Sequence, residues 1–358
     1  MPSLRRSILN RLGAHGVWPA LVGVAAAFLL ANVLTACFIL STPGRRVDPA
    51  VGEVWRAGTI VSGTEGYGVS HWGADGTREV TRSSKDASSP TVLFLGDSFT
   101  EALYVNDSQT FVQILQDRLG AVTGGAKMVN AAVAEGNPAK YIDLASAYRK
   151  RYDPAVTVVQ LNEYDIGPEL MTPTVSHWLE SSGDSWTVES TQPGQLEVLA
   201  GRILSPVPAL YRLAQRLKAG GGADAQGSSD ATGSTDSPAG ATPDPRLVAW
   251  LVKELAAKYG DRLVVLWIPA VDYFGTTSEP TAMELAVKEE AARQGVVFVD
   301  PRAQLAADYE QTRQPAYGFA NTQPGRGHIN SRGHRIIAEV LSPVLGKLLA
   351  EQAQSGLN

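Results

Sequence analysis

The chain has 358 residues, of which 44% are hydrophobic and 19% charged, and its formal net charge at pH 7 is -5. This length suits one large domain with additional segments, and the composition is that of a globular protein. The acidic balance, without a basic patch interleaved with aromatic residues, excludes a nucleic-acid partner. Cys37 is the single cysteine, so an internal disulfide and a cysteine-based metal cluster are also excluded.

An apolar run near the N-terminus, from Val17 to Leu40, contains no charged residue. About 20 apolar residues are enough to cross a bilayer. Three arginines precede the run, and basic residues favour the cytoplasmic side of a membrane. We therefore expect a cytoplasmic N-terminus (1–16), a transmembrane signal anchor (17–41), and a periplasmic or otherwise extracytoplasmic location for the remaining chain.

Two other interpretations of this apolar run stay open. Leu34-Thr35-Ala36-Cys37 resembles a lipobox, in which Cys37 would be lipidated and become the new N-terminus, although Phe38-Ile39-Leu40 continue the apolar run beyond it. The other interpretation is a simple cleaved signal peptide. Each interpretation places the remaining chain outside the cytoplasm.

Residues 42–90 are rich in Gly, Ser, Thr and Pro, with short β-type runs such as Thr59-Ile60-Val61. Asp75-Gly76 is a turn signal within this segment. We interpret the segment as a stalk with short strands that leads into the main domain.

From Thr91 onward, short runs dominated by apolar residues alternate with helical patterns. Such runs are typical of buried parallel strands, and the alternation predicts right-handed crossovers in a doubly wound sheet. The predicted strands are Thr91–Leu95, Lys127–Asn130, Ala155–Leu161, Leu263–Ile268 and Val296–Val299. The predicted helices are Gln109–Leu119, Ala139–Arg151, Arg246–Tyr259, Thr281–Gln294 and a final one from about Ser331 to Glu351.

Residues 219–245 interrupt this pattern with a low-complexity run of Gly, Ala, Ser, Thr and Asp. Such a run cannot bury enough apolar surface to offset the entropy of ordering it. Because the strand pattern resumes afterwards, we predict a disordered surface insertion within one domain at 91–352.

The first predicted strand stops at Gly96, and Asp97-Ser98 follow directly. Ligand crevices form at the carboxyl ends of strands in open α/β sheets. An acyl-transfer nucleophile needs a fixed turn there, with backbone N–H groups nearby. The block Thr91–Glu101 resembles the Gly-Asp-Ser block that opens the SGNH (GDSL) hydrolase family. The resemblance makes Ser98 the expected nucleophile, and we expect Asp97 to fix the turn through backbone hydrogen bonds.

The resemblance covers about residues 88–350, apart from the insertion. It implies a three-layer α/β/α flavodoxin-like fold with a five-stranded parallel sheet, here preceded by one transmembrane helix. It also implies acyl transfer from an ester to Ser98, with no cofactor. Among other motifs, neither a His-x-x-x-His pair, an EF-hand spacing nor a Gly-rich phosphate loop occurs.

The block Gly327-His328-Ile329-Asn330-Ser331-Arg332-Gly333-His334 resembles the last block of the same family. The resemblance makes His328 the general base, and Asn330 is a candidate cap for the final helix. His334 is interpreted as structural. His71 is a rival base, because Ser70-His71-Trp72 is similar to the Asp-x-His-Trp motif of alginate-type O-acetyltransferases without its Asp.

The acid of the expected triad is missing from its usual place. The family has an Asp two or three residues before the histidine, where this chain has Arg326 and Gly325. Three alternatives stay open: a Ser–His dyad supported by a backbone carbonyl, a carboxylate from elsewhere such as Asp300 or Asp308, or weak catalysis. Triads that lack one member keep part of their rate enhancement.

The oxyanion donors also depart from the family pattern. Besides Ser98, the candidates are Gly136 in the second block and Asn162 or Tyr164 in the third. Tyr164 stands where the family has Asn, and Asn162 lies two residues earlier, on the same face of an extended chain. An ordinary role at the end of a strand stays open for both.

Together these features predict a serine-dependent, carbohydrate esterase-like acyl-ester hydrolase that acts outside the cytoplasm on an O-acylated carbohydrate or another ester. An O-acetyltransferase that modifies an exported polysaccharide is one alternative. A non-catalytic carbohydrate-binding or assembly protein of the same fold is the other. Four tryptophans are candidates for stacking on a sugar, although a core role is favoured for the last of them: Trp72, Trp178, Trp186 and Trp267.

Overall fold

The computed structural model describes residues 17–38, 45–63, 65–82, 89–120, 125–134, 136–173, 176–183, 185–191, 244–269 and 279–355. The chain divides into two compact units, residues 1–44 with 194–229 and residues 45–193 with 230–358. The predicted insertion lies outside the described residues as far as position 243. The described chain resumes at Asp244, which caps the next helix.

In the first unit, the described residues form helix α2 (Val17–Phe38), which falls within the predicted segment 17–41. Across the part of the chain that the structure describes, no helix is long and apolar enough to cross a membrane. The signal anchor and the location outside the cytoplasm stay predictions. The predicted cytoplasmic residues 1–16 lie outside the described residues.

The second unit is built on a five-stranded parallel sheet, as the family resemblance implies, and its strand order is β6-β5-β7-β10-β11. Every residue of β5 and of β10 is buried, as expected for strands covered on both faces. All five strands end within one residue of their predicted bounds: β5 (Thr91–Leu95), β6 (Lys127–Asn130), β7 (Pro154–Leu161), β10 (Leu263–Trp267) and β11 (Val297–Val299).

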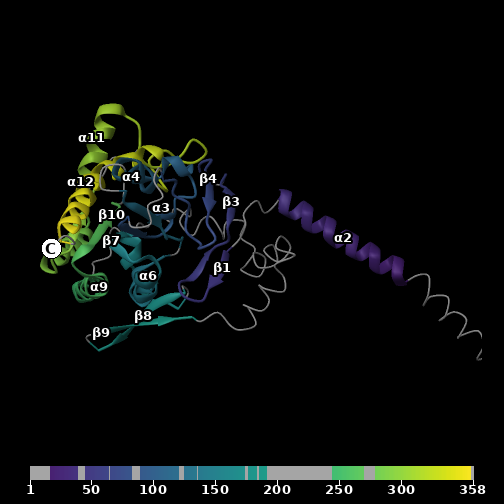
Figure 1. The fold of residues 1–358 in the computed structure, drawn as a ribbon, viewed down its shortest axis with the longest axis horizontal. Helices are drawn as coiled ribbons and strands as arrows, with labels where there is room; N and C mark the ends of the chain where they lie inside the picture. Colours follow the sequence, from purple (N-terminus) through teal and green to yellow (C-terminus); the bar gives the residue numbers. More distant parts are fainter. Residues whose placement is uncertain are drawn as a thin grey trace, which may run out of the picture. The chain divides into compact units, whose positions relative to one another are not determined.

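Helices cover both faces of this sheet and make it the middle of three layers (Figure 1). Successive residues of β5 alternate between the faces, so Leu93 joins one apolar core and Phe94 the other. The helices of the first core are α5 (Pro138–Asp143), α6 (Ala145–Tyr152), α9 (Pro245–Tyr259) and α10 (Ala282–Arg293). Those of the second are α4 (Phe111–Leu119), α11 (Arg302–Thr312) and α12 (Ser331–Ser355).

Some elements differ from the sequence prediction. The helix predicted at 139–151 is two helices, α5 and α6, which meet at Leu144. Helix α11 was not predicted, because only Arg302 and Leu305 on it are buried and its apolar periodicity is weak. Neither was the antiparallel hairpin of β8 (His177–Ser182) and β9 (Ser185–Ser190). Short 3-10 helices lie at Asp107–Gln109, Glu163–Ile166, Pro168–Met171 and Gly260–Arg262.

The predicted stalk at 42–90 is wrong, because its described residues from Arg45 onward belong to the compact second unit. Trp55, Ile60 and Trp72 of this segment are buried together in a small apolar cluster. Four short strands form two antiparallel hairpins: β1 (Arg45–Asp48) with β2 (Gly52–Trp55), and β3 (Gly58–Val61) with β4 (Val69–Trp72).

The second hairpin is joined to the edge of the main sheet. Arg78 forms antiparallel bridges with Trp72 of β4 and with Asn130 of β6. The Arg78 side chain is buried and donates to the backbone carbonyls of Glu101, Ala102 and Val105. The N-terminal segment therefore covers a sheet edge beside the predicted nucleophile, whereas its composition predicted a stalk with short strands.

Candidate active site

The nucleophile turn follows β5 as predicted, and Ser98 is the first residue of the short helix α3 (Ser98–Glu101). Asp97 caps this helix, because its Oδ1 accepts a hydrogen bond of 2.9 Å from the backbone N–H of Phe99. Gln160 at the end of β7 accepts from the backbone N–H of Asp97 at 3.1 Å. The neighbouring strand therefore helps to hold the serine in place, and the predicted role of Asp97 is confirmed.

His328 lies against this serine. Its Nε2 is 2.8 Å from Oγ of Ser98, although the two residues are 230 positions apart in the sequence. The imidazole ring packs against the rings of Tyr104 and Phe99, whose centroids are 4.3 Å and 5.1 Å away. Ser98 and His328 are only 4% and 3% exposed. The pair is therefore held in a largely water-free environment, where hydrogen bonds between polar groups are stronger than in water.

The carboxylate beside His328 comes from Glu65, on the loop between β3 and β4. Its Oε2 lies 2.5 Å from Nδ1 of the imidazole, and its Oε1 accepts from the backbone N–H of His328 at 2.9 Å. Glu65 is 6% exposed. Ser98, His328 and Glu65 therefore form one continuous hydrogen-bonded chain, with each ring nitrogen of the histidine assigned to one partner.

The two predicted acids, Asp300 and Asp308, are wrong. Asp300 accepts from the backbone N–H of Arg302 at the start of α11. Asp308 forms ion pairs with Arg332 and Arg335 of α12. Both carboxylates are thus used to hold helices, and the acid comes instead from the segment that was interpreted as a stalk.

Gly327 explains how a glutamate reaches the histidine from that side. Its φ is +83°, a left-handed conformation that side chains disfavour. A methyl group at this position would lie 2.4 Å from Oε1 of Glu65. The absence of a side chain before His328 therefore leaves room for the carboxylate. In the sequence, a glycine directly before His328 indicates that another group approaches the backbone closely at this position. It does not indicate that this group is Glu65.

Asn162 is the oxyanion candidate whose side chain is hydrogen-bonded to the nucleophile turn. Its Nδ2 donates to Oδ2 of Asp97 at 2.7 Å, and its Oδ1 accepts from the backbone N–H of Tyr164 at 2.8 Å. The Tyr164 side chain is 57% exposed. Gly136 uses its own N–H to donate to the carbonyl of Val133 at 2.9 Å, so the prediction of Gly136 as a donor is not supported.

The rival base His71 lies elsewhere, on the solvent side of β4. Its Nδ1 is 2.6 Å from Oδ2 of Asp107, which also binds the buried Arg78. The structure brings His71 together with an acid, and among the described residues no serine hydroxyl is hydrogen-bonded to its ring. His71 as the base is therefore wrong.

His334 is structural, as predicted. It is fully buried, and its Nδ1 accepts from the backbone N–H of Phe111 at 3.3 Å. Burial, with smaller contributions from Arg78 and His328, lowers its pKa to about 3. Asn330 caps α12 as predicted, because its Oδ1 accepts from the backbone N–H of Arg332 at 3.0 Å.

The tryptophans are mostly core residues. Trp267 is fully buried as predicted, and Trp72 and Trp186 are buried as well. Trp178 is half-buried on β8. The prediction that Trp72 or Trp186 stacks on a sugar is therefore wrong, because neither ring is accessible in the folded chain.

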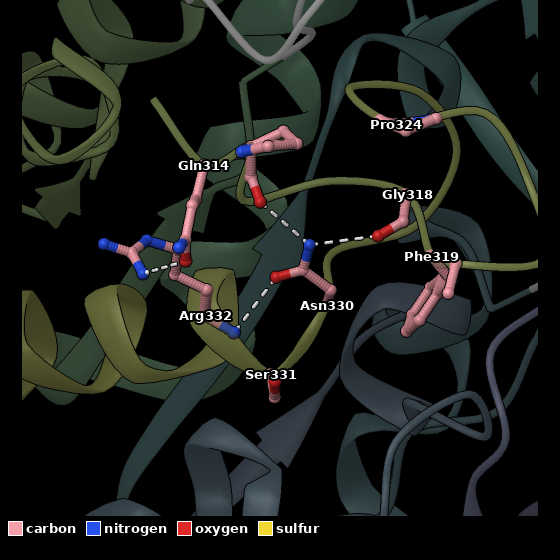
Figure 2. A pocket seen from close by; sticks show the side chains of 9 residues that line it. Gln314, Gly318, Phe319, Pro324, Asn330, Ser331 and Arg332 are labelled. Atoms are coloured by element: carbon pink, nitrogen blue, oxygen red, sulfur yellow. Dashed lines mark hydrogen bonds between the residues drawn. The ribbon is translucent and has the colours of Figure 1, made fainter. Parts of the chain in front are cut away.

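A surface cavity of about 420 Å³ lies beside the loop that carries His328. Figure 2 shows Asn330 at its centre, with the side-chain amide donating to the carbonyls of Pro315 and Gly318. Arg332 donates to the side-chain oxygen of Gln314, which lies beside it to the left of Asn330 in this view. These bonds hold the histidine loop in shape. Within the described ranges, no cluster of three or more His, Cys, Asp or Glu residues could hold a metal ion.

No family model and no curated protein matches the chain. Solved structures similar to it include an alpha/beta hydrolase enzyme from the metagenome of Lake Arreo, Spain, with 14% identity, a TM-score of 0.39, and coverage of 72% of this chain and 96% of that one. A psychrotrophic esterase from Pseudoalteromonas sp. has 12% identity, a TM-score of 0.37, and coverage of 73% and 98%. The lipase/acylhydrolase from Enterococcus faecalis has 9% identity, a TM-score of 0.39, and coverage of 72% and 96%.

The sheet and the site of this chain agree with the resemblance found in its sequence. The five-stranded parallel sheet, the Gly-Asp-Ser turn after β5 and the histidine before the last helix are the features that the SGNH (GDSL) hydrolase resemblance predicted. Membership of this family stays a prediction. The departure from its usual pattern is the origin of the acid, because a glutamate from the N-terminal hairpin occupies the place of the aspartate before the histidine.

Proposed function

We propose that this protein is a serine-dependent ester hydrolase that works through a Ser98 acyl-enzyme. The observation that carries the proposal is the hydrogen-bonded chain from Oγ of Ser98 through the imidazole of His328 to the carboxylate of Glu65. A serine hydroxyl is a weak nucleophile unless a base takes its proton, and the base must itself be held in one tautomer. All three groups are buried, so the arrangement is maintained without competition from bulk water.

In the proposed reaction, Oγ of Ser98 attacks the ester carbonyl carbon while Nε2 of His328 takes the hydroxyl proton. Glu65 accepts the hydrogen bond from the Nδ1–H and stabilises the imidazolium that forms. The C–O bond to the alcohol then breaks, and the imidazolium gives its proton to the leaving alcohol. Water attacks the acyl-enzyme by the same route, which releases the carboxylic acid and restores the Ser98 hydroxyl.

The developing oxyanion needs hydrogen-bond donors next to Ser98. We assign this role to the side-chain amide of Asn162 and the backbone N–H of Ser98. Asn162 is supported by its 2.7 Å bond to Asp97, which ties the amide to the nucleophile turn and leaves a second Nδ2 hydrogen to donate. Tyr164 is not assigned, because its side chain is largely exposed.

The substrate proposal is an O-acylated carbohydrate or a related ester outside the cytoplasm. The location outside the cytoplasm is supported by the charge-free apolar run at 17–40 and the arginines before it, which predict export. Mass spectrometry of the mature protein tests the export interpretations. A lipid on Cys37 would show that the protein is a lipoprotein and not held by a signal anchor. An N-terminus beyond residue 40 without a lipid would indicate a cleaved signal peptide.

The catalytic proposal is tested by p-nitrophenyl acetate hydrolysis with the wild type, Ser98→Ala and Glu65→Gln. We expect Ser98→Ala to lower kcat by at least about 10³-fold, because acyl transfer loses its nucleophile. Equal rates for wild type and Ser98→Ala would contradict the enzyme and favour a non-catalytic binding protein. A transferase would differ in a second assay, in which an added oligosaccharide acceptor becomes acetylated in a Ser98-dependent way.

A further inference from the structure

The catalytic acid depends on the conformation of the short loop between β3 and β4, whose described residues are 62, 63 and 65–68. The loop is closed by a 2.8 Å hydrogen bond from the backbone N–H of Ser62 to the carbonyl of Gly68. Glu65 lies at its middle and extends into the protein, with both carboxylate oxygens on His328. Both hydrogen bonds between Glu65 and His328 therefore require the loop backbone to keep this conformation.

One side chain from the distant C-terminal part of the chain holds that backbone. Oδ1 of Asn321 accepts from the backbone N–H of Gly66 at 2.8 Å. Its Nδ2 donates to the carbonyl of Gly63 at 3.1 Å and to that of Gly66 at 3.4 Å. Asn321 therefore binds the loop on both sides of Glu65 and uses its acceptor and its donor group.

The loop is also closely packed at the same place. A methyl group at Gly66 would lie 2.4 Å from the carbonyl oxygen of Tyr104 and 2.7 Å from the ring of Phe319. Tyr104 in turn packs on the imidazole of His328. Phe319 and Asn321 belong to one short segment, and this segment packs against the loop that carries Glu65.

We propose that Asn321 is a positioning residue for the reaction, acting through Glu65. The inference rests on the proposed function, since Glu65 matters to the chemistry only if Ser98 and His328 react. Asn321 is exposed, and its hydrogen bonds among the described residues go to the loop backbone. Loosening the loop would let the carboxylate leave Nδ1 and let the imidazole turn away from Ser98. Small displacements of catalytic groups are costly for rate.

The test is a double-mutant cycle on p-nitrophenyl acetate hydrolysis with Asn321→Ala, Glu65→Gln and the combined variant. We expect Asn321→Ala to lower kcat by about ten- to a hundredfold with KM unchanged, because the loop orients the base and does not bind this small ester. In the Glu65→Gln background the same change should have almost no effect. Gln323→Ala, an exposed side chain two residues further along the same segment, is the control and should keep wild-type kcat.

An equal loss in both backgrounds, or wild-type kcat in Asn321→Ala, would overturn the positioning role. A conservative variant sharpens the result, because Asn321→Asp keeps the acceptor for Gly66 but loses the donor, and we expect a smaller loss than for Asn321→Ala.

A readout that does not depend on activity separates this inference from the proposed function. Proton NMR of the wild type should show the far-downfield resonance of the His328 N–H that bonds to Glu65, identified by its loss in His328→Gln. We expect this resonance to broaden or vanish in Asn321→Ala and to persist in Gln323→Ala. If wild type and Ser98→Ala hydrolyse equally but the resonance responds in this way, the proposed function fails, and Asn321 holds Glu65 on His328 without a role in a reaction. A resonance unchanged in Asn321→Ala contradicts the positioning role alone.

Discussion

Two histidine–carboxylate pairs, one formed by the β3–β4 loop and one by β4 itself, show how similar contacts lead to different chemistry. His328 and Glu65 are buried, and the far ring nitrogen of His328 is 2.8 Å from the Ser98 hydroxyl. His71 and Asp107 are joined by a bond of almost the same length, but the His71 side chain is 51% exposed. Asp107 also binds Arg78, so its charge is already compensated.

The difference lies in what surrounds each pair and not in the pair itself. A carboxylate can support a histidine as a base only when the imidazole has a nucleophile on its other nitrogen and is kept from bulk water. His328 meets both conditions, whereas His71 faces solvent on the exposed side of β4. The predictions below set changes at the buried pair against matched changes elsewhere.

The largest expected effect is the loss of the base. His328→Ala should lower kcat for p-nitrophenyl acetate by about 10⁴-fold or more, because the Ser98 proton then has no acceptor. His71→Ala should leave kcat within about twofold of wild type. A comparable loss in both variants, measured by steady-state kinetics, would mean that the surface pair takes part in the reaction.

Substitutions of the two carboxylates, Glu65 and Asp107, should also differ in their effect on kcat. Glu65→Gln should lower kcat by about 10³- to 10⁴-fold, because the amide can present the wrong hydrogen-bonding group to Nδ1 and does not stabilise the imidazolium. Asp107→Asn should leave kcat nearly unchanged and lower the melting temperature, because the buried Arg78 loses its charged partner. Kinetics and thermal unfolding of both variants check this pair of outcomes, and a fully active Glu65→Gln would reduce the site to a Ser–His dyad.

The approach of Glu65 to His328 can be blocked without touching either residue. Gly327→Ala places a methyl group 2.4 Å from Oε1 of Glu65, so kcat should fall by about 10²-fold. The left-handed conformation should also cost about 1–2 kcal/mol of stability. Gly260→Ala is the control, because Gly260 has a φ of +80° but no atom within 4 Å of the added methyl group. It should lose stability and keep its activity. Equal activity in the two variants would contradict the steric role of Gly327.

The smallest expected effect concerns the neighbouring buried His334. Its pKa is about 3 in the folded protein, lowered by burial from 6.5. Between these two pH values the unfolded chain binds the extra proton, so the free energy of unfolding falls as pH falls through this window. From pH 7 to pH 5, His334 should lower the free energy of unfolding by about 2 kcal/mol.

Urea unfolding at pH 7 and pH 5 measures the effect. His334→Gln should lose about 2 kcal/mol less than wild type on going to pH 5, because the titrating group is gone. His177, whose pKa is also lowered by burial, is present in both proteins, and its contribution cancels in the comparison. The same loss of stability in both proteins would contradict a neutral buried His334.

Much of the fold could be predicted because its signals are local. The five parallel strands are short buried apolar runs, and the helices between them show the spacing of side chains that face a sheet. Helix α11 and the β8–β9 hairpin were missed because few of their residues are apolar and buried. The segment with the hairpins at 45–72 was predicted to be a stalk, because strands of only four residues show almost no alternation of apolar and polar residues.

The sequence by itself determined the nucleophile and the base of the proposed reaction. Ser98 follows a buried strand and His328 precedes the last helix, so each was identified from residues next to it. Only the tertiary structure decided the acid. Glu65 and His328 are 263 residues apart, and nothing in the spacing of either segment connects them. The pairing depends on a loop held by Asn321 and on the space left at Gly327, which are contacts that exist only once the chain is folded.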